Sequence, residues 1–377
     1  MSGFMQHGEY WEQGHSHEGA PVDVDHFDGP NDNICNSTVT YMLDGNVGLA
    51  ADLALMAQAA ALARERNRTF FVDDTYWTRG KWTDYFQDVA ITQQGPEPGC
   101  SRPPPEELLA KYHFGHAFQN HYENSYGHDL NRARPIFEHS EASFSTTIQL
   151  NERMTSLINT AKQELLASIS TQDPHLNIDE HNTAESDYIS VHIRRGDRIP
   201  HGWEYHRKPI PIKEYVDAVL ETIKRTQESD SSKPPVVYVA SDSPAAIDEF
   251  TQAYHGSTFA LAKSVHSDVR RLSSPKEYRQ DTFDALSPEE RRSLTKGALI
   301  DLALVTGLWD SGRDPHLHAT ICSVSSNFGR LAVIGLGWDK AFGNVNKMGE
   351  IDQANKRWVD VDLKGHEIPV WEAFELF

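Results

Sequence analysis

The stretch Tyr188–Ile199, YISVHIRRGDRI, joins a short apolar run to a cluster of charged residues. Its apolar, β-branched first half predicts a buried strand. Charged side chains that directly follow a parallel strand lie at the carboxyl edge of the sheet, where open α/β folds bind their ligands. Guanidinium groups match phosphate oxygens bidentately and stay charged at physiological pH. The stretch therefore predicts a phosphate clamp made by Arg194 and Arg195, with a diphosphate as the first ligand to test.

A solvated turn is the alternative interpretation of two adjacent arginines, and two observations favour the clamp. His192 lies inside the strand, at a position where an apolar residue would pack better. The following segment is also basic in a chain of net charge −20, because only Asp197 and Glu204 oppose Arg194, Arg195, Arg198, Arg207 and Lys208.

Length and composition limit the classes of protein to consider. A chain of 377 residues predicts two domains, since single cores seldom exceed roughly 250–300 residues. The net charge of −20 argues against a general nucleic-acid-binding protein, which needs a basic face. No apolar run approaches the ~20 residues of a membrane span, and the polar N-terminus carries no visible secretory signal.

Alternating strand and helix patterns predict an α/β fold. We expect a flexible, acidic and His-rich tail at residues 1–33, and an N-terminal α/β domain at 34–187. A Rossmann-like domain should occupy residues 188–345, followed by an extension at 346–377. Within the Rossmann-like domain, the charged residues 263–296 predict a mobile surface excursion.

Three predicted strands of the second domain end in polar residues, and these ends should meet at one crevice. They are Arg194 and Arg195, then Ser241 and Asp242, then the Ser325–Asn327 triplet before a helix. Alone, the triplet predicts only a helix N-cap. Beside two arginines, its hydroxyls and the free backbone N–H groups predict an anion site that needs no metal.

Two smaller features each allow two interpretations. The aromatic residues Trp77, Trp82, Tyr85 and Phe86 either line a sugar or base pocket or pack beneath a loop. The three cysteines are either buried thiols of a cytosolic protein or a Cys35–Cys100 disulfide with Cys322 free. Two glycosylation sequons, at Asn36 and Asn67, favour the disulfide weakly.

The HxRRxD core at His192–Asp197 resembles the first shared motif of the α-1,2-, α-1,6- and protein O-fucosyltransferase superfamily. The resemblance is closest to the α-1,6-fucosyltransferase and nodulation fucosyltransferase group. It covers residues 35–342 and extends over Cys35, Asp44–Gly48, Trp77, Trp82–Phe86 and Cys100, and over the segments HIRRGD, YVASDSP, GALID and CSVSSN.

The resemblance implies a GT-B-like fold, with two Rossmann-like domains facing a central cleft. It also implies an inverting, metal-independent transfer of fucose from GDP-fucose to a glycan or glycoprotein acceptor, without a cofactor. The alternative is a catalytically silent GDP-sugar-binding relative that acts as a binding module. An NAD-dependent oxidoreductase is disfavoured, because no GxGxxG follows an early strand.

By the same resemblance, Arg194 and Arg195 would bind the diphosphate, while His192 and Asp301 would approach the guanosine. Glu204 would be the catalytic base, with Asp197 as the fallback because two extra residues separate Glu204 from the motif. The predicted donor site comprises His192, Arg194, Arg195, Arg198, Asp242, Asp301, Ser325, Ser326, Asn327, Gly45 and Asn46.

A disulfide would indicate the secretory pathway, and the resemblance points to the Golgi lumen, with this chain as an ectodomain or fragment. Without the disulfide, a cytoplasmic location is expected.

Overall fold

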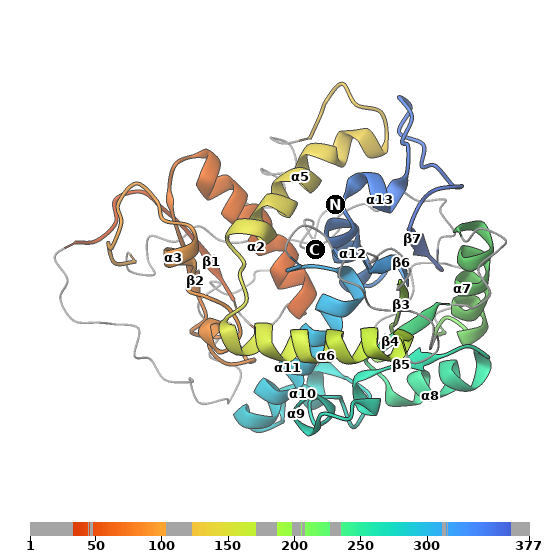
Figure 1. Ribbon diagram of the computed structural model, residues 1–377. Coiled ribbons are helices and arrows are strands. Elements are labelled where there is room, and N and C mark those ends of the chain that lie inside the picture. Colours follow the sequence, from red (N-terminus) through yellow and green to blue (C-terminus); the bar gives the residue numbers. More distant parts are fainter. Residues whose placement is uncertain are drawn as a thin grey trace, which may run out of the picture.

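The computed structural model describes residues 33–43, 45, 48–102, 123–170, 187–197, 205, 208–226, 235–310, 314 and 316–362. The predicted tail at residues 1–33 lies outside these ranges apart from Asn33. The described chain is a mixed α/β structure with two parallel sheets, which confirms the predicted α/β class. Figure 1 shows the small sheet and the larger sheet on opposite sides, with long helices between them.

The larger sheet has five strands that pair in parallel. Its order across the sheet is β5 (Thr258–Phe259), β4 (Val236–Ser241), β3 (Tyr188–Ile193), β6 (Leu317–Cys322) and β7 (Trp358–Asp360). The first of these strands in the chain, β3, is central. The chain adds β4 and β5 on one side of β3 and then crosses to the other side, where it adds β6 and β7. The strand order therefore reverses between β3 and β6. Doubly wound sheets place their ligand crevice at this reversal.

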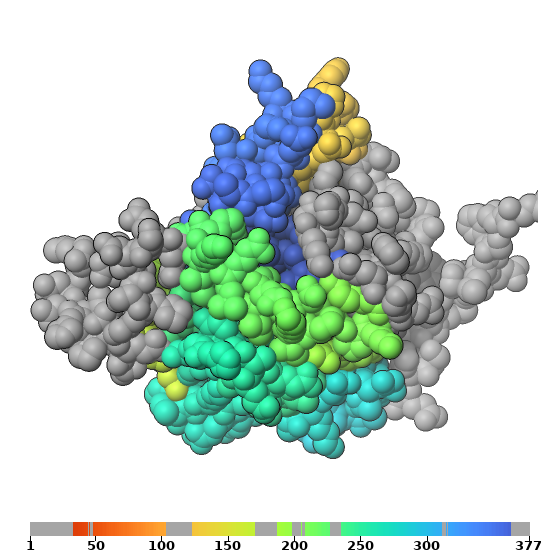
Figure 2. All heavy atoms as spheres, turned by 90° about the vertical axis from the view of Figure 1, so that its right-hand side faces the viewer, coloured from red at the N-terminus to blue at the C-terminus, as the bar shows by residue number. Residues whose placement is uncertain are grey.

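Alternation along β3 directs its side chains to two helical layers. Ile189, Val191 and Ile193 pack in the apolar cluster of α7 (Ile212–Thr226) and α8 (Pro244–Ala253). Figure 2 shows the side of the molecule on which the green α7 and α8 lie. On the opposite face, the Tyr188 hydroxyl donates to the Leu304 carbonyl at 2.9 Å, in helix α11 (Pro288–Thr306).

The small sheet pairs β1 (Thr38–Met42) with β2 (Thr69–Asp73), and helix α2 (Leu49–Glu65) connects them. A disulfide joins Cys35 to Cys100 with their Cα atoms 5.1 Å apart, as predicted, and Cys322 is a buried free thiol. The other helices are η2 (Trp82–Asp84), α3 (Val89–Thr92), α5 (Leu130–Thr146), α6 (Glu152–Ser170), η6 (Leu261–Lys263), α9 (Ser267–Arg270), α10 (Gln280–Asp284), α12 (Asn327–Leu336) and α13 (Trp338–Phe342). Within the described ranges, no helix is long and apolar enough to cross a membrane.

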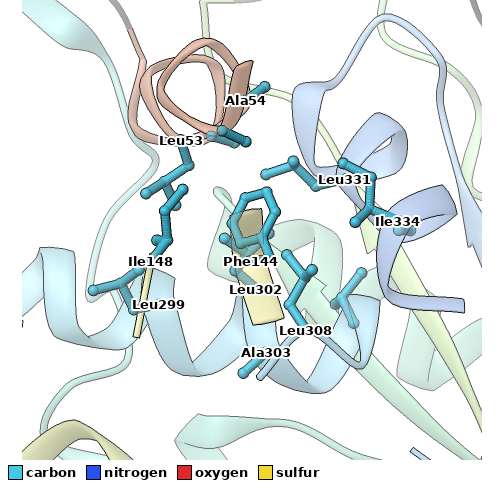
Figure 3. Close-up of a cluster of buried hydrophobic side chains, with 14 of the residues drawn as sticks. Leu53, Ala54, Phe144, Ile148, Leu299, Leu302, Ala303, Leu308, Leu331 and Ile334 are labelled. Carbon is cyan, nitrogen blue, oxygen red and sulfur yellow. The ribbon is translucent and has the colours of Figure 1, made fainter. Parts of the chain in front are cut away.

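One hydrophobic cluster extends from the small-sheet helix α2 to the helices α11 and α12 of the larger sheet. In Figure 3, Leu53 and Ala54 of α2, Leu331 of α12 and Leu302 of α11 lie around the ring of Phe144. Alanine occupies much of the buried surface of α2, and its small side chain lets neighbouring helices approach closely. The boundary between the two predicted domains at residue 187 stays a prediction.

The aromatic residues after β2 pack beneath a loop. Trp77, Trp82, Tyr85 and Phe86 are buried, and the rings of Trp82 and Phe86 stack with centroids 4.0 Å apart. They contribute to the same cluster as α2, so the packing interpretation holds.

The prediction of a surface excursion at residues 263–296 is wrong. This segment forms η6, α9, α10 and the start of α11, and it buries Val269, Leu272 and Phe283. Its apolar residues are few and widely spaced among charged ones, so no period of 2 or 3.6 is visible in the sequence.

Leu331→Ala should test the shared core, because Leu331 is fully buried between α2 and α11. We expect the free energy of unfolding to fall by about 2–5 kcal/mol, from lost burial and the cavity left behind. The matched control is Leu220→Ala on α7, where the side chain is 52% exposed and a change within ~0.5 kcal/mol is expected. Urea unfolding measures both, and equal effects would contradict the shared core.

Candidate functional site

A cleft of about 470 Å³ lies at the carboxyl edge of the five-stranded sheet, at the reversal between β3 and β6. Segments next to the small sheet also line it: the first turn of α2, which connects β1 to β2, and Arg79, which follows β2. The remaining wall includes His192, Arg194, Asp197, Ser241, Asp242, Leu272, Ser274, Tyr278, Gln280, Phe283, Asp301, Ser325, Ser326, Asn327 and Phe328.

Arg194 lies in this cleft between two carboxylates. Its Nη1 donates to Asp242, and its Nη2 donates to Asp197 Oδ1 at 2.8 Å. The Arg194 Cζ atom is also 5.6 Å from the ring centroid of Tyr278. Burial raises the pKa of Asp242, while the Arg194 charge opposes that rise. The two carboxylates therefore hold the guanidinium in one place and offset part of its charge.

Arg195 is placed differently, although the sequence predicts the same role for it. Its backbone N–H donates to Asp242 Oδ1 at 2.8 Å, but its Nη2 donates to Glu249 of α8 at 3.0 Å. It is not among the residues that line the cleft. The alternation of β3 continues past its end: Ile193 and Arg195 lie on the side of α8, while His192 and Arg194 lie on the side of the cleft.

His192 is buried beneath the cleft, with its ring stacked on Phe328 at a centroid distance of 4.4 Å. Its Nδ1 is 3.4 Å from the Ser326 hydroxyl. Burial, helped by the nearby Arg194 charge, lowers the pKa of His192 to about 3. The ring is therefore neutral at physiological pH, with one nitrogen free to accept a hydrogen bond and the other to donate one.

Asp301 of α11 also lines the cleft, where it is half-buried. The hydroxyl of Tyr238, on β4, donates to Asp301 Oδ1 at 2.5 Å. Burial raises the pKa of Asp301 to about 7, and the hydrogen bond from Tyr238 opposes part of this rise. Near neutral pH the carboxyl can therefore accept hydrogen bonds on both oxygens when it is ionised, or donate one from its O–H when it is protonated.

Two helices begin at the cleft, and neither has a side-chain cap. Helix α2 follows Gly48, and Leu49, Ala50 and Ala51 line the wall. Helix α12 follows Ser326, whose side chain makes no capping bond. The first N–H groups of a helix have no intrahelical acceptor, and the macrodipole makes that end positive. Both helix starts therefore favour an anion in the cleft.

Several predicted residues lie away from the cleft or outside the described ranges. Gly45 has φ +75°, where glycine is favoured, but it does not line the cleft. Asn46, Arg198 and Glu204 are outside the described residues. Within the described ranges, no group of three His, Cys, Asp or Glu side chains is placed to hold a metal ion.

Sequence reasoning missed Arg79, Tyr278 and Phe283, which all line the cleft. Tyr278 and Phe283 belong to the charged segment that was expected on the surface. Arg79 follows β2 in a region where only the aromatic residues stood out, and no local pattern distinguishes it from a solvated arginine.

Comparison with known proteins gives only distant similarities. No family model matches the chain, and no curated protein matches it. The structure is similar to that of the fucosyltransferase NodZ from Bradyrhizobium (TM-score 0.42, 16% identity, 78% of this chain and 91% of that one). It is also similar to FUT1 of Arabidopsis thaliana in complex with GDP (0.38, 13%, 87% and 73%). A third similar structure is POFUT1 in complex with GDP (0.37, 13%, 80% and 95%).

Asp301→Asn should change how stability depends on pH. The pKa of Asp301 is about 7 in the folded state and about 3.9 in an unfolded chain, so between these values the folded state binds more protons. The stability from this group is present below about pH 4 and is lost as pH rises through about 7.

Relative to Asp301→Asn, the wild type should therefore lose up to about 1.4 kcal/mol per pH unit in that window and level off above it. Urea unfolding of both proteins at a series of pH values measures the difference. A difference that is constant across the window would contradict the raised pKa.

Proposed function

We propose that the chain is a GDP-fucose-dependent fucosyltransferase that transfers fucose, with inversion and without a metal, to a glycan or glycoprotein. The observation that carries the proposal is the cleft at the β3–β6 reversal, where the Arg194 guanidinium and two uncapped helix starts provide a site for a diphosphate. The HIRRGD sequence at this point adds the family resemblance. In this proposal the cleft separates the two domains of a GT-B-like fold, with the donor on the side of residues 188–345.

Cleavage of a sugar–diphosphate bond builds negative charge on the leaving oxygen. A fixed cation and oriented N–H groups stabilise such charge by several kcal/mol. Arg194 is held by Asp242 and Asp197 before any ligand arrives, so it needs little reorganisation during the reaction. His192 and Asp301 would approach the guanosine, and Ser325, Ser326 and Asn327 would contact phosphate.

Transfer also needs a carboxylate to accept the proton of the acceptor hydroxyl. We assign this role to Glu204. Asp197 is less suited, since its Oδ1 accepts from Arg194 and its Oδ2 accepts from the Gln280 N–H at 3.1 Å. Both oxygens of Asp197 therefore already accept hydrogen bonds within the protein, and neither is placed to take a proton from an acceptor hydroxyl.

The proposed location is the lumen of the secretory pathway, with the Golgi as the compartment. The Cys35–Cys100 disulfide supports an oxidising environment, because such bonds seldom persist in the cytosol. The proposed partners are a GDP-sugar donor and a glycan or glycoprotein, without nucleic acid.

A GDP-release assay tests the function directly. The purified chain should release GDP from GDP-fucose faster than from GDP-mannose or GDP-glucose, and the rate should rise with a glycan or glycopeptide acceptor. EDTA should leave the rate unchanged. GDP-fucose binding without any turnover would favour the catalytically silent binding module, and rescue of an EDTA-inhibited enzyme by Mn²⁺ would refute the metal-free mechanism.

Arg194→Gln should weaken GDP binding roughly 10- to 100-fold, because it removes a charge-assisted pair worth about 1.5–3 kcal/mol. Arg195→Gln is the matched control at the neighbouring position. In the wild type, the Arg195 guanidinium pairs with the 53% exposed Glu249 outside the cleft. A change of less than about threefold is expected there, as for other exposed ion pairs. Titration calorimetry measures both affinities, and an unchanged affinity in Arg194→Gln would refute the site.

Glu204→Gln should reduce turnover by a factor of about 10²–10⁴ and leave the GDP affinity nearly unchanged, since a positioned base acts on the proton and not on the donor. Asp197→Asn should weaken GDP binding together with turnover, because it removes one of the two carboxylates that hold the Arg194 guanidinium in place. Steady-state kinetics and calorimetry separate the two effects. Near-wild-type turnover in Glu204→Gln would show that another group is the base.

A further inference from the structure

Arg79 is a buried arginine in the cleft wall, contributed by the segment between β2 and η2. Its exposed fraction is only 5%. The Cζ atom lies 4.5 Å from the ring centroid of Phe283 and 6.0 Å from that of Tyr278. Its carbonyl accepts from the Tyr85 hydroxyl, so the backbone is tied to the aromatic core. The guanidinium is therefore held in the cleft and does not extend into bulk water.

The charge of Arg79 has no carboxylate to offset it in the part of the chain that the structure describes. Arg194 pairs with Asp242 and Asp197, and Arg195 pairs with Glu249. For the Arg79 guanidinium, the described residues provide one hydrogen bond, from Nη2 to the Tyr278 hydroxyl at 3.0 Å. A guanidinium has five N–H donors, and a buried cation without a counter-charge is costly. Two aromatic rings offset only part of that cost.

The guanidinium groups of Arg79 and Arg194 both lie over the aromatic ring of Tyr278. The two Cζ atoms are 6.0 Å and 5.6 Å from its centroid. The Tyr278 N–H donates to the Asp242 carbonyl at 2.7 Å, and its hydroxyl donates to Gln280 at 2.7 Å. The segment that carries this ring is thus fixed to the end of β4, and the two guanidinium groups have a set separation.

We infer that Arg79 is a second phosphate-binding residue, and that Arg79 and Arg194, rather than Arg194 and Arg195, bind the diphosphate of the nucleotide. This inference rests on the proposed function, because it names the groups that hold the proposed donor. An anion that approaches Arg194 also approaches Asp242 and Asp197, whereas Arg79 adds positive charge that no carboxylate among the described residues pairs with. The donor would then contact both the end of β3 and the segment that follows β2.

Titration calorimetry with GDP and with guanosine tests the inference. Arg79→Gln should weaken GDP binding roughly 10- to 100-fold, as expected for the loss of a charge-assisted hydrogen bond to phosphate. Guanosine, which lacks phosphate, should bind Arg79→Gln as it binds the wild type. Arg79→Lys keeps the charge and should retain more of the GDP affinity than Arg79→Gln.

Two further variants serve as controls. Arg134→Gln removes another arginine stacked on an aromatic ring, 5.3 Å from Trp338 and outside the cleft, and it should leave GDP binding unchanged. Tyr278→Phe keeps the ring but removes the hydroxyl that accepts from Arg79, and it should weaken GDP binding severalfold. If Arg79→Gln does not fold, Arg79→Lys and Tyr278→Phe decide the question by their ratio of GDP to guanosine affinity.

The outcomes separate this inference from the proposed function. A wild-type chain that does not bind GDP would refute the proposed function itself. GDP binding by the wild type with an unchanged affinity in Arg79→Gln would overturn the inference alone. Equal weakening of GDP and guanosine would also overturn it, because a structural role predicts that result. A larger loss of GDP affinity in Arg195→Gln than in Arg79→Gln would also overturn the inference, because it would show that Arg195 makes the second phosphate contact.

Discussion

The candidate site depends on one buried carboxylate, that of Asp242. It accepts from the Arg194 guanidinium and from the Arg195 backbone N–H, so it joins the end of β4 to the end of β3. Gly196 makes this possible, because a Cβ there would lie 2.6 Å from Asp242 Oδ2 and 2.4 Å from the Tyr278 carbonyl. Its φ of +22° also disfavours other residues. The direction of Arg194 into the cleft follows from these contacts.

The hydrophobic cluster between α2, α11 and α12 also determines the geometry of the site. It packs the small-sheet helix against the helices that carry Asp301 and Asn327. Since native cores are densely packed, a shift of α2 would disturb both walls of the cleft together. The position of Arg79 relative to Arg194 therefore depends on apolar packing as much as on the polar contacts around Tyr278.

Much of the five-stranded sheet could be predicted, because its strands are short apolar runs that end abruptly in polar residues. The motif resemblance predicts Asp301 and Ser326 in the site, and both line the cleft. Residues 263–296 were assigned to the surface because their apolar residues have no clear period. Yet Phe283 is buried against Arg79, at a distance in sequence that no local pattern encodes.

The amino-acid sequence alone predicts the strand that ends at Ile193 and the clustering of polar residues at strand ends, while it leaves the state of the cysteines open. These are local properties of composition and spacing, which the chain carries before it folds. Which of the two adjacent arginines enters the cleft, and that Arg79 joins it, follow from the folded arrangement alone. Arg79 and Arg194 come from segments far apart in the sequence that meet at the Tyr278 ring, and such proximity has no signature in a single sequence.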